Sequence, residues 1–210
     1  MSKKGLFITL EGVEGVGKST NLQYIHKLLS DELQVPVMVT REPGGTPLAE
    51  ELRGVLLQPR GEHVNELTEL MLMFAARAQH LHERILPSLH QGVWVLCDRF
   101  TDATYAYQGS GRGMCVDVIA SLEQLVQGEV RPDLTFLLDL PVEVGLARAQ
   151  ARGQMDRFES EQSAFFERVR EGYLKRAKCE PDRFVIIDAQ PPLEEVQAQI
   201  RQALLTRASK

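Results

Sequence analysis

One octapeptide near the start of the chain restricts the possible folds more than any other stretch. Residues 12–19 read G-V-E-G-V-G-K-S and match the pattern G-x-x-x-x-G-K-S. The apolar residues 6–10 before it predict a buried strand, and residues 20–29 after it have the pattern of a helix. In that context the glycines turn backbone N–H groups inward around phosphate oxygens, and the helix N-terminus adds the positive end of its dipole. The sequence therefore predicts a loop that binds a nucleoside triphosphate.

The residues of this loop have different expected roles. Lys18 is expected to reach the β- and γ-phosphates, and the hydroxyl of Ser19 is expected to ligate Mg²⁺. The triphosphate would lie along the backbone of the whole segment, so we predict ATP contacts from Gly12, Val13, Glu14, Gly15, Val16, Gly17, Lys18, Ser19 and Thr20.

Composition and charge exclude several classes of protein. Of the 210 residues 43% are hydrophobic and 25% charged, as in ordinary globular proteins, and no apolar stretch reaches the ~20 residues of a membrane helix. We expect no signal peptide, and three scattered cysteines predict reduced thiols in a cytoplasmic protein. A net charge of −5 argues against a general nucleic-acid binder. Yet 17 of the 24 basic residues are arginines, whose planar forks suit a small polyanion.

The hydrophobic pattern predicts an α/β fold. Short β-branched runs alternate with helical patterns, which favours a doubly wound, five-stranded parallel sheet with helices on both faces, the three-layer architecture of P-loop NTPases. We interpret residues 1–210 as a single domain without an internal linker. The expected strands are residues 6–10, 37–40, 93–97, 134–138 and 184–187, and the expected later helices are residues 46–57, 65–89, 117–127, 142–152, 163–178 and 193–206.

Charged residues directly follow two of the other predicted strands. Ligands bind outside the carboxyl ends of the strands in such sheets, so these positions are candidates for a site. Arg41-Glu42 follows the second strand, where a turn alone does not explain two charges. Asp98-Arg99 follows the third, and an aspartate at that point of a phosphate-loop protein is expected to hold Mg²⁺, directly or through water.

A basic segment at about 148–160 is expected to form a mobile lid. It carries Arg148, Arg152 and Arg157 around a glycine and has few apolar anchors. Such a segment could close over a triphosphate and exclude water. Gln190, in the turn after the last strand, is expected to border the adenine.

Taken together and in order, the motifs resemble those of the thymidylate kinases, a family of P-loop nucleoside monophosphate kinases. The shared segments are E-G-x-E-G-x-G-K-S, R-E-P-G-G-T, F-A-A-R, D-R-F followed by T-Y-A-Y-Q-G, R-G-x-x-D-R and D-A-x-x-P. The resemblance covers nearly the whole chain and implies transfer of a phosphoryl group from ATP to dTMP, with Mg²⁺, to make dTDP for dTTP synthesis. It also implies a homodimer. Gly15 in the loop, with arginines in the lid, is typical of the lid-arginine bacterial type.

The resemblance further implies how dTMP is bound. Arg77 of F-A-A-R would donate to the thymine O4, Thr104 and Gln108 would address the base edge, and Tyr107 would pack where a 2′-hydroxyl would sit. Glu14 and Glu42 would orient the acceptor or its metal-bound water. Arg41, Arg53 and Arg99 would hold the acceptor phosphate, and the residues expected to act on the transferred group are Lys18, Glu14, Arg99, Arg152 and Arg157.

One position departs from the family pattern. Family members usually carry phenylalanine four residues before the base-binding arginine, where it stacks on thymine, but this chain has Met73 there and Phe74 next. Either the Met73 thioether packs on the base or a local shift brings Phe74 to it; both side chains could also belong to the helix core. The alternatives for function are a kinase for another small acceptor, such as dCMP, UMP or a non-nucleotide alcohol, and a P-loop ATPase switch.

Overall fold

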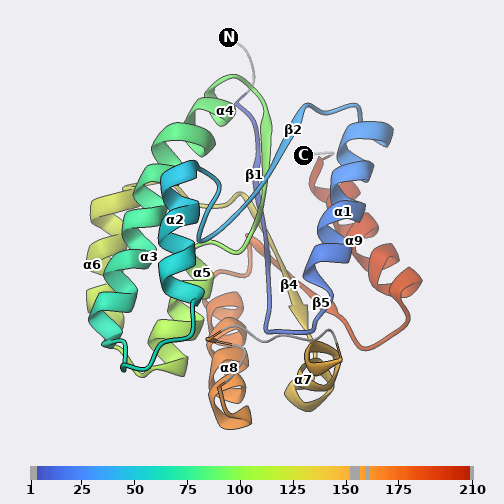
Figure 1. Ribbon diagram of the computed structural model, residues 1–210. Helices are drawn as coiled ribbons and strands as arrows, with labels where there is room; N and C mark the ends of the chain where they lie inside the picture. Colours follow the sequence, from blue (N-terminus) through green and yellow to red (C-terminus); the bar gives the residue numbers. More distant parts are fainter. Residues whose placement is uncertain (1–3, 152–156, 159–160, 209–210) are drawn as a thin grey trace.

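A parallel five-stranded sheet forms the centre of the molecule (Figure 1). The computed structural model describes residues 4–151, 157–158 and 161–208. The strand order is β2-β3-β1-β4-β5, and every neighbouring pair is parallel. The predicted fold class is therefore confirmed. The strands are β1 (Phe7–Glu11), β2 (Val37–Arg41), β3 (Trp94–Asp98), β4 (Leu134–Asp139) and β5 (Phe184–Asp188).

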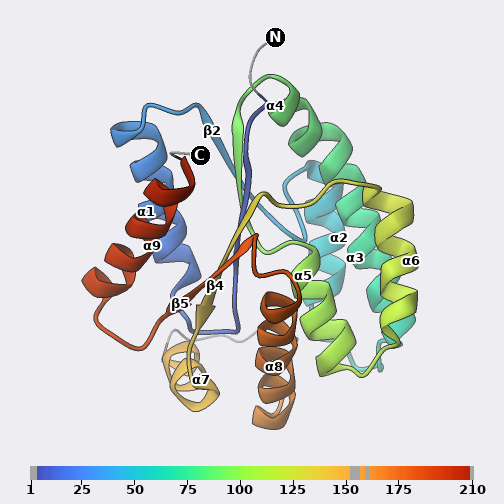
Figure 2. The same ribbon diagram turned by 180° about the vertical axis from the view of Figure 1, so that it is seen from behind.

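Helices cover both faces of this sheet, as Figures 1 and 2 show from opposite sides. The helices α1 and α9 lie on one face, and α2, α3 and α6 lie on the other. The helical segments are α1 (Lys18–Lys27), η1 (Leu28–Glu32), α2 (Pro47–Leu57), α3 (Glu66–His80), η2 (Leu81–Ile85), α4 (Leu86–His90), α5 (Thr101–Thr104), η3 (Tyr105–Gly111), α6 (Val116–Gln127), α7 (Val142–Gln150), α8 (Ser163–Cys179) and α9 (Leu193–Ala208). No helix within the described ranges is long and apolar enough to cross a membrane.

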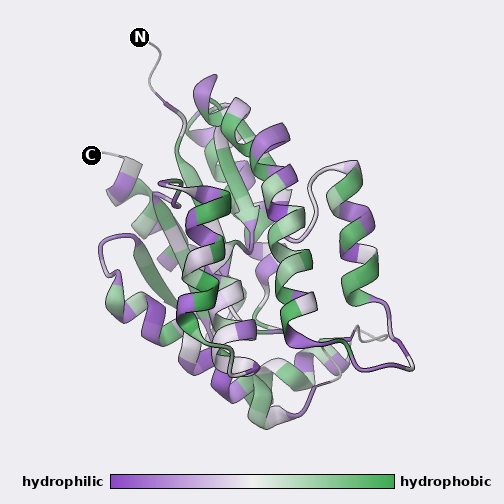
Figure 3. Ribbon diagram, turned by 90° about the vertical axis from the view of Figure 1, so that its left-hand side faces the viewer, coloured by the Kyte–Doolittle hydropathy of each residue, from purple (hydrophilic) through white to green (hydrophobic). Residues whose placement is uncertain are grey.

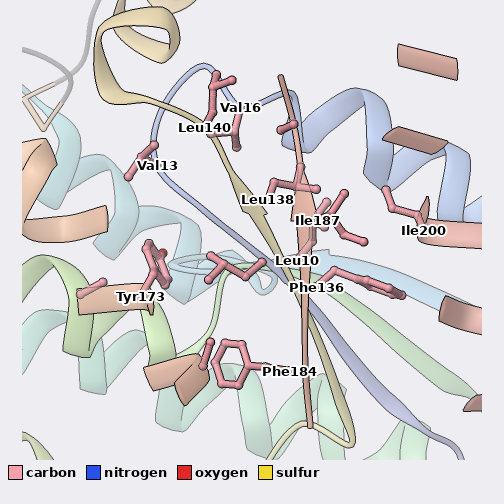
Figure 4. Packing of buried hydrophobic residues seen from close by; sticks show 14 of the residues in the cluster. Leu10, Val13, Val16, Phe136, Leu138, Leu140, Tyr173, Phe184, Ile187 and Ile200 are labelled. Atoms are coloured by element: carbon pink, nitrogen blue, oxygen red, sulfur yellow. The ribbon is translucent and has the colours of Figure 1, made fainter. Parts of the chain in front are cut away.

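The main core lies between the sheet and its helices and reaches into the phosphate loop. All five residues of β1 are buried, which explains the continuous apolar run that predicts this strand. Val13 and Val16 belong to the same buried cluster as Leu138 and Leu140, and in Figure 4 the Val16 side chain lies beside Leu140, in the turn after β4. Because two loop side chains are embedded in the core, the loop is fixed at the carboxyl ends of the strands.

Helix starts follow their sequence signals. The Thr46 side chain accepts a hydrogen bond from the Ala49 N–H at 3.2 Å, and Pro47 is the first residue of α2. Asn65 caps α3 in the same way, accepting from the Leu67 N–H at 3.0 Å. The predicted helix over 65–89 is present, although it runs through α3, η2 and α4 and has a wider turn in the middle.

A helical stretch that the hydrophobic pattern does not predict follows β3. It runs through α5 and η3, and nearly all of η3 is buried, including Tyr107, Gln108 and Gly109. A helix buried on all sides has no polar face, so it lacks the 3.6-residue alternation from which amphipathic helices are predicted. This missed helix carries three of the side chains expected to bind dTMP.

Candidate active site

A cavity of about 530 Å³ opens at the carboxyl ends of the strands. Residues from the phosphate loop, the turn after β2, α3, the end of β3 and the missed helix line it. The predicted site residues among them are Glu14, Gly15, Gly17, Lys18, Ser19, Thr20, Glu42, Arg53, Met73, Arg77, Asp98, Arg99, Thr104, Tyr107, Gln108 and Arg148. One cavity thus brings together residues expected to bind two different substrates.

The other predicted site residues lie around this cavity rather than on its wall. Those within the described residues are Gly12, Val13, Val16, Arg41, Phe74, Arg157 and Gln190. Of the two residues that could pack on the base, Met73 lines the cavity and Phe74 does not. The Phe74 ring packs beneath the Arg77 guanidinium, with 4.8 Å between the ring centre and Cζ. Arg152 and most of the predicted lid, residues 152–156 and 159–160, lie outside the described residues.

Lys18 is folded back against its own loop. Its ammonium group donates to the carbonyls of Gly12 and Val13, both at 3.1 Å. Burial, reinforced by the nearby Arg99 cation, lowers the pKa of Lys18 from its ordinary value. A polyanion in the cavity would add negative charge to that of Glu14, Asp98 and Glu11, which already favour the charged ammonium.

Gly15 allows the phosphate loop and α7 to approach closely. Its φ of +73° is in the left-handed region, and a Cβ atom there would lie 1.9 Å from the carbonyl oxygen of Gly145. A Cβ on Gly145 would lie 2.6 Å from the Glu14 carbonyl oxygen in turn. An arginine at position 15 would therefore require α7 to move, which is a physical reason for the glycine.

Arg99 links the end of β3 to the phosphate loop. It donates to the Gly12 carbonyl at 2.9 Å and forms an ion pair with Glu14 at 2.5 Å. Its φ of +65° is unusual for a residue with a side chain and costs roughly 1–2 kcal/mol, so the surrounding contacts must hold it. Tyr107 also donates to Glu14, at 3.1 Å.

Arg77 is held by a buried hydrogen-bonded cluster. Its Nε donates to Glu42 at 2.7 Å and its Nη2 to the Thr104 hydroxyl at 2.9 Å, while Nη1 has no partner within the described ranges. His80, one helical turn after Arg77, meets the other Glu42 oxygen at 3.0 Å. Burial opposes the charge on Glu42, but Arg77 and His80 outweigh it, so the pKa of Glu42 lies below its ordinary value.

Asp98 and Ser19 are the candidate cation ligands. Both line the cavity, and the buried Asp98 Oδ1 has no hydrogen-bond partner within the described part of the chain. Hard cations such as Mg²⁺ prefer hydroxyl and carboxylate oxygens. The donor set therefore fits a cation that arrives with the triphosphate and takes its remaining ligands from phosphate and water.

Two predicted arginines form ion pairs elsewhere in this structure. Arg41 pairs with Glu50 at 2.7 Å on an exposed surface. Arg157 pairs with buried Glu69 at 2.6 Å and donates to the Leu56 carbonyl at 2.8 Å. Neither side chain reaches the cavity wall, whereas Arg53 and Arg148 do.

Glu11, the last residue of β1, is a supporting residue that the sequence analysis does not single out. It accepts from the Phe100 N–H at 2.7 Å and from the Tyr173 hydroxyl at 2.8 Å, so it ties the turn after β3 to α8. Burial, together with the Asp102 carboxylate, raises the pKa of Glu11 from 4.5 to about 8. A sequence signal exists, because Glu11, like Asp98, is a carboxylate that ends an apolar strand.

The raised pKa of Glu11 predicts a pH-dependent stability. Between pH 4.5 and about 8 the native state keeps a proton that the unfolded state has lost. Glu11 therefore lowers the free energy of unfolding by about 1.4 kcal/mol per pH unit as pH rises through this window. Glu11→Gln should remove that slope, which urea unfolding at several pH values would measure. If the free energy of unfolding changes with pH in the same way in the unmodified protein and in Glu11→Gln, the raised pKa of Glu11 is contradicted.

Comparison with known proteins identifies the family. The family model "Thymidylate kinase" matches residues 10–200. The chain is 62% identical to the thymidylate kinase of Pseudomonas putida (strain W619), over 93% of this chain and 94% of that one. It is 57% identical to that of Hahella chejuensis (strain KCTC 2396), over 98% of each.

A solved structure is similar along nearly the same length. The crystal structure of thymidylate kinase from Ehrlichia chaffeensis superposes with a TM-score of 0.78 at 35% identity, covering 96% of this chain and 99% of that one. The fold and the sequence therefore agree on one assignment. The chain belongs to the thymidylate kinase family.

Proposed function

We propose that the cavity holds ATP and dTMP together and that the chain transfers the γ-phosphoryl group of ATP to dTMP, which gives dTDP for dTTP synthesis. Family membership supports the reaction. The observation that supports the site most strongly is that one cavity is lined by the phosphate loop and by Arg77, Thr104 and Gln108. A site for ATP alone would give these three buried polar side chains no partner in the cavity.

Phosphoryl transfer in such a site depends on positioning and charge rather than on a base. A nucleoside monophosphate already carries roughly 1.5–2 negative charges near pH 7, so its oxygen needs no deprotonation. In our proposal Lys18 neutralises the β- and γ-phosphates, while Arg53 and Arg99 hold the acceptor phosphate. These cations would offset the repulsion between two polyanions and stabilise charge on the equatorial oxygens in the transition state.

Mg²⁺ is part of the proposal because Asp98 and Ser19 fit it. Ser19 would ligate the cation directly, and Asp98 would hold it directly or through water. Mg²⁺ held by these two residues would supply Lewis-acid chemistry, that is, positive charge that stabilises the transferring phosphoryl group. The chain's own contribution is the placement of these two oxygens on the cavity wall.

Residues that line the same cavity would contact the base and the sugar of dTMP. Arg77 would donate to the thymine O4, Thr104 and Gln108 would contact the base edge, and Met73 would pack on the ring. Tyr107 would occupy the space of a 2′-hydroxyl; its ring lies 6.2 Å from that of Phe158, and its hydroxyl is bound to Glu14. These contacts would favour thymine deoxynucleotides over ribonucleotides.

The remaining predicted residues surround the ATP end. Gln190 would border the adenine, and Arg148, which donates weakly to the neighbouring Ala189 carbonyl at 3.3 Å, would contact the triphosphate. Arg152 and Arg157 would complete the charge around it and keep water away. In our proposal Arg157 keeps its contact with Glu69 and adds its positive charge to the ATP end of the site. Arg41, the last residue of β2, would add charge to the acceptor side.

Measurement of ADP release with a panel of monophosphates tests the proposal. We expect dTMP to stimulate ADP release strongly and dCMP and UMP to do so weakly, with no turnover in the absence of an acceptor. Equal stimulation by dCMP or UMP would favour a different acceptor. Turnover that does not depend on a monophosphate would favour an ATPase switch.

We also propose that the chain acts as a cytoplasmic homodimer. Large apolar side chains that remain exposed gather on α2, α3 and α6, which form the side of the molecule in Figure 3. Exposed apolar side chains on neighbouring helices would be buried if a second copy of the chain packed against this side. Analytical ultracentrifugation should give twice the chain mass, and a monomer at micromolar concentration would refute the dimer. The exposed apolar residues on these three helices are Leu48, Val55, Leu67, Met71, Val116, Val118 and Leu125.

A further inference from the structure

We propose that Glu69 determines which atom of Gln108 faces the base and so excludes cytosine from the acceptor site. Glu69 lies on α3, eight residues before Arg77, and does not line the cavity. It would act as a positioning residue, through Gln108, rather than by touching the substrate. The inference rests on the proposed assignment of Gln108 to the base edge and deepens it.

The evidence begins with a buried contact between the two side chains. Glu69 is 1% exposed and Gln108 is 1% exposed, and the Gln108 Nε2 donates to Glu69 Oε1 at 2.8 Å. Arg157 forms an ion pair with the other Glu69 oxygen at 2.6 Å, and Arg112 lies 3.6 Å from the first. Two guanidinium groups thus hold the Glu69 side chain in place.

A carboxylate can only accept hydrogen bonds, and this decides the orientation of the Gln108 amide. The NH₂ group of Gln108 must face Glu69, because its carbonyl oxygen would be repelled there. The carbonyl oxygen is then on the side of the amide turned away from Glu69, and we assign it to the cavity, which the Gln108 side chain lines. The orientation is imposed by charge, so free rotation of the amide is prevented.

Arg77 supplies a hydrogen-bond donor beside the acceptor of Gln108. Its Nη1 is buried and has no partner within the described residues, and Arg77 can only donate. Because both residues line the cavity, our proposal gives its wall one donor, from Arg77, and one acceptor, from Gln108. Glu42 keeps the Arg77 guanidinium in place and Glu69 keeps the Gln108 amide in place.

This pair of polar groups matches thymine and opposes cytosine. Thymine presents the O4 acceptor beside the N3–H donor, whereas cytosine presents the N4 amino donor beside the N3 acceptor. Cytosine would set donor against donor at Arg77 and acceptor against acceptor at Gln108. A buried polar group without a partner is costly, so each mismatch lowers the efficiency with dCMP.

The test compares kcat/KM for dTMP and dCMP in Glu69→Gln. A glutamine at position 69 can accept or donate, so the Gln108 amide is released and can turn its NH₂ group toward the N3 of cytosine. We expect the dTMP-to-dCMP ratio to fall by about tenfold or more, the usual effect of one polar mismatch. If both substrates lose the same factor and the ratio is unchanged, Glu69 is merely structural and the proposal is wrong.

Gln108→Leu and the double variant show whether the effect passes through Gln108. The ratio should fall in Gln108→Leu, and adding Glu69→Gln should change it no further. Gln108→Leu leaves Glu69 intact, so it tests the proposal even if Glu69→Gln does not fold. An unchanged dTMP-to-dCMP ratio in Gln108→Leu would overturn the proposal. A further effect of Glu69→Gln in the Gln108→Leu background would overturn it as well.

Glu123→Gln is the matched control for loss of a buried carboxylate. Glu123 is 5% exposed and pairs with Tyr105 and Arg131 outside the cavity wall. Glu123→Gln should lower the melting temperature but leave the dTMP-to-dCMP ratio unchanged. If this ratio falls as far as in Glu69→Gln, a specific role for Glu69 is contradicted. Absence of any activity of the unmodified enzyme with dTMP would instead refute the proposed function, so the two failures are distinct.

Discussion

Lys18→Ala is expected to lower kcat for dTDP formation by at least about 100-fold while the chain stays folded. The loss follows because Lys18 is the loop cation proposed to stabilise charge on the transferring group, and removal of one such donor costs a factor of 10²–10³. Steady-state ADP release at saturating ATP and dTMP measures it. Binding of dTMP should change little, because the proposed base contacts lie on α3, α5 and η3.

The fold should tolerate this change because Lys18 contributes little that other residues need. Its ammonium group bonds only two carbonyls of its own loop among the described residues, and burial beside Arg99 already disfavours its charge. The melting temperature should therefore stay within a few degrees. Lys18→Met, which keeps the apolar stem, is the control: it should be equally inactive. Activity in Lys18→Met near that of the unmodified enzyme would contradict the electrostatic role.

Arg77→Ala is expected to raise KM for dTMP by about 10- to 100-fold while ATP affinity stays nearly constant. The variant loses the buried donor proposed for the thymine O4, and hydrogen bonds from charged donors are worth about 1.5–3 kcal/mol. Kinetics with varied dTMP and direct ATP binding measure the two effects separately. An equal loss of ATP and dTMP affinity would contradict a role in base recognition.

Arg77→Ala should also lower the stability of the fold, and this loss must be separated from the rise in KM for dTMP. Without Arg77, Glu42 stays buried with His80 as its remaining close partner, and breaking a buried ion pair typically costs 3–5 kcal/mol. Arg77→Ala with Glu42→Gln removes the unpaired charge and should recover much of that stability. The high KM for dTMP should persist in the double variant; its return to the original value would assign the defect to misfolding.

Much of the site could be predicted because its signals are local. The phosphate loop depends on glycine conformations and a helix N-terminus, and the Thr46 cap and Pro47 depend on the first turn of one helix. Asp98 and Arg99 could be found from their place after an apolar strand, since all parallel strands end at the same edge. Each of these inferences needs only neighbouring residues and one rule of sheet topology.

The remaining features depend on contacts between distant segments. No local pattern indicates that Glu42 meets both Arg77 and His80, or that Glu69 holds Gln108 and Arg157. The helix that carries Thr104 and Gln108 has no amphipathic pattern because packing buries it on all sides. Met73, rather than Phe74, reaches the cavity because of the rotation of α3, which its packing sets.

The sequence by itself determined the phosphate loop, the alternation of strands and helices apart from the helical stretch after β3, and the edge of the sheet where the cavity opens. These follow from backbone conformation and hydrophobic periodicity, which act over a few residues. Only the tertiary structure decided how the charges behind the site are paired and thus which polar atoms face the cavity. The physical reason is that a buried carboxylate needs its partners within about 3 Å, and packing alone brings residues 35 or 39 positions apart to that distance.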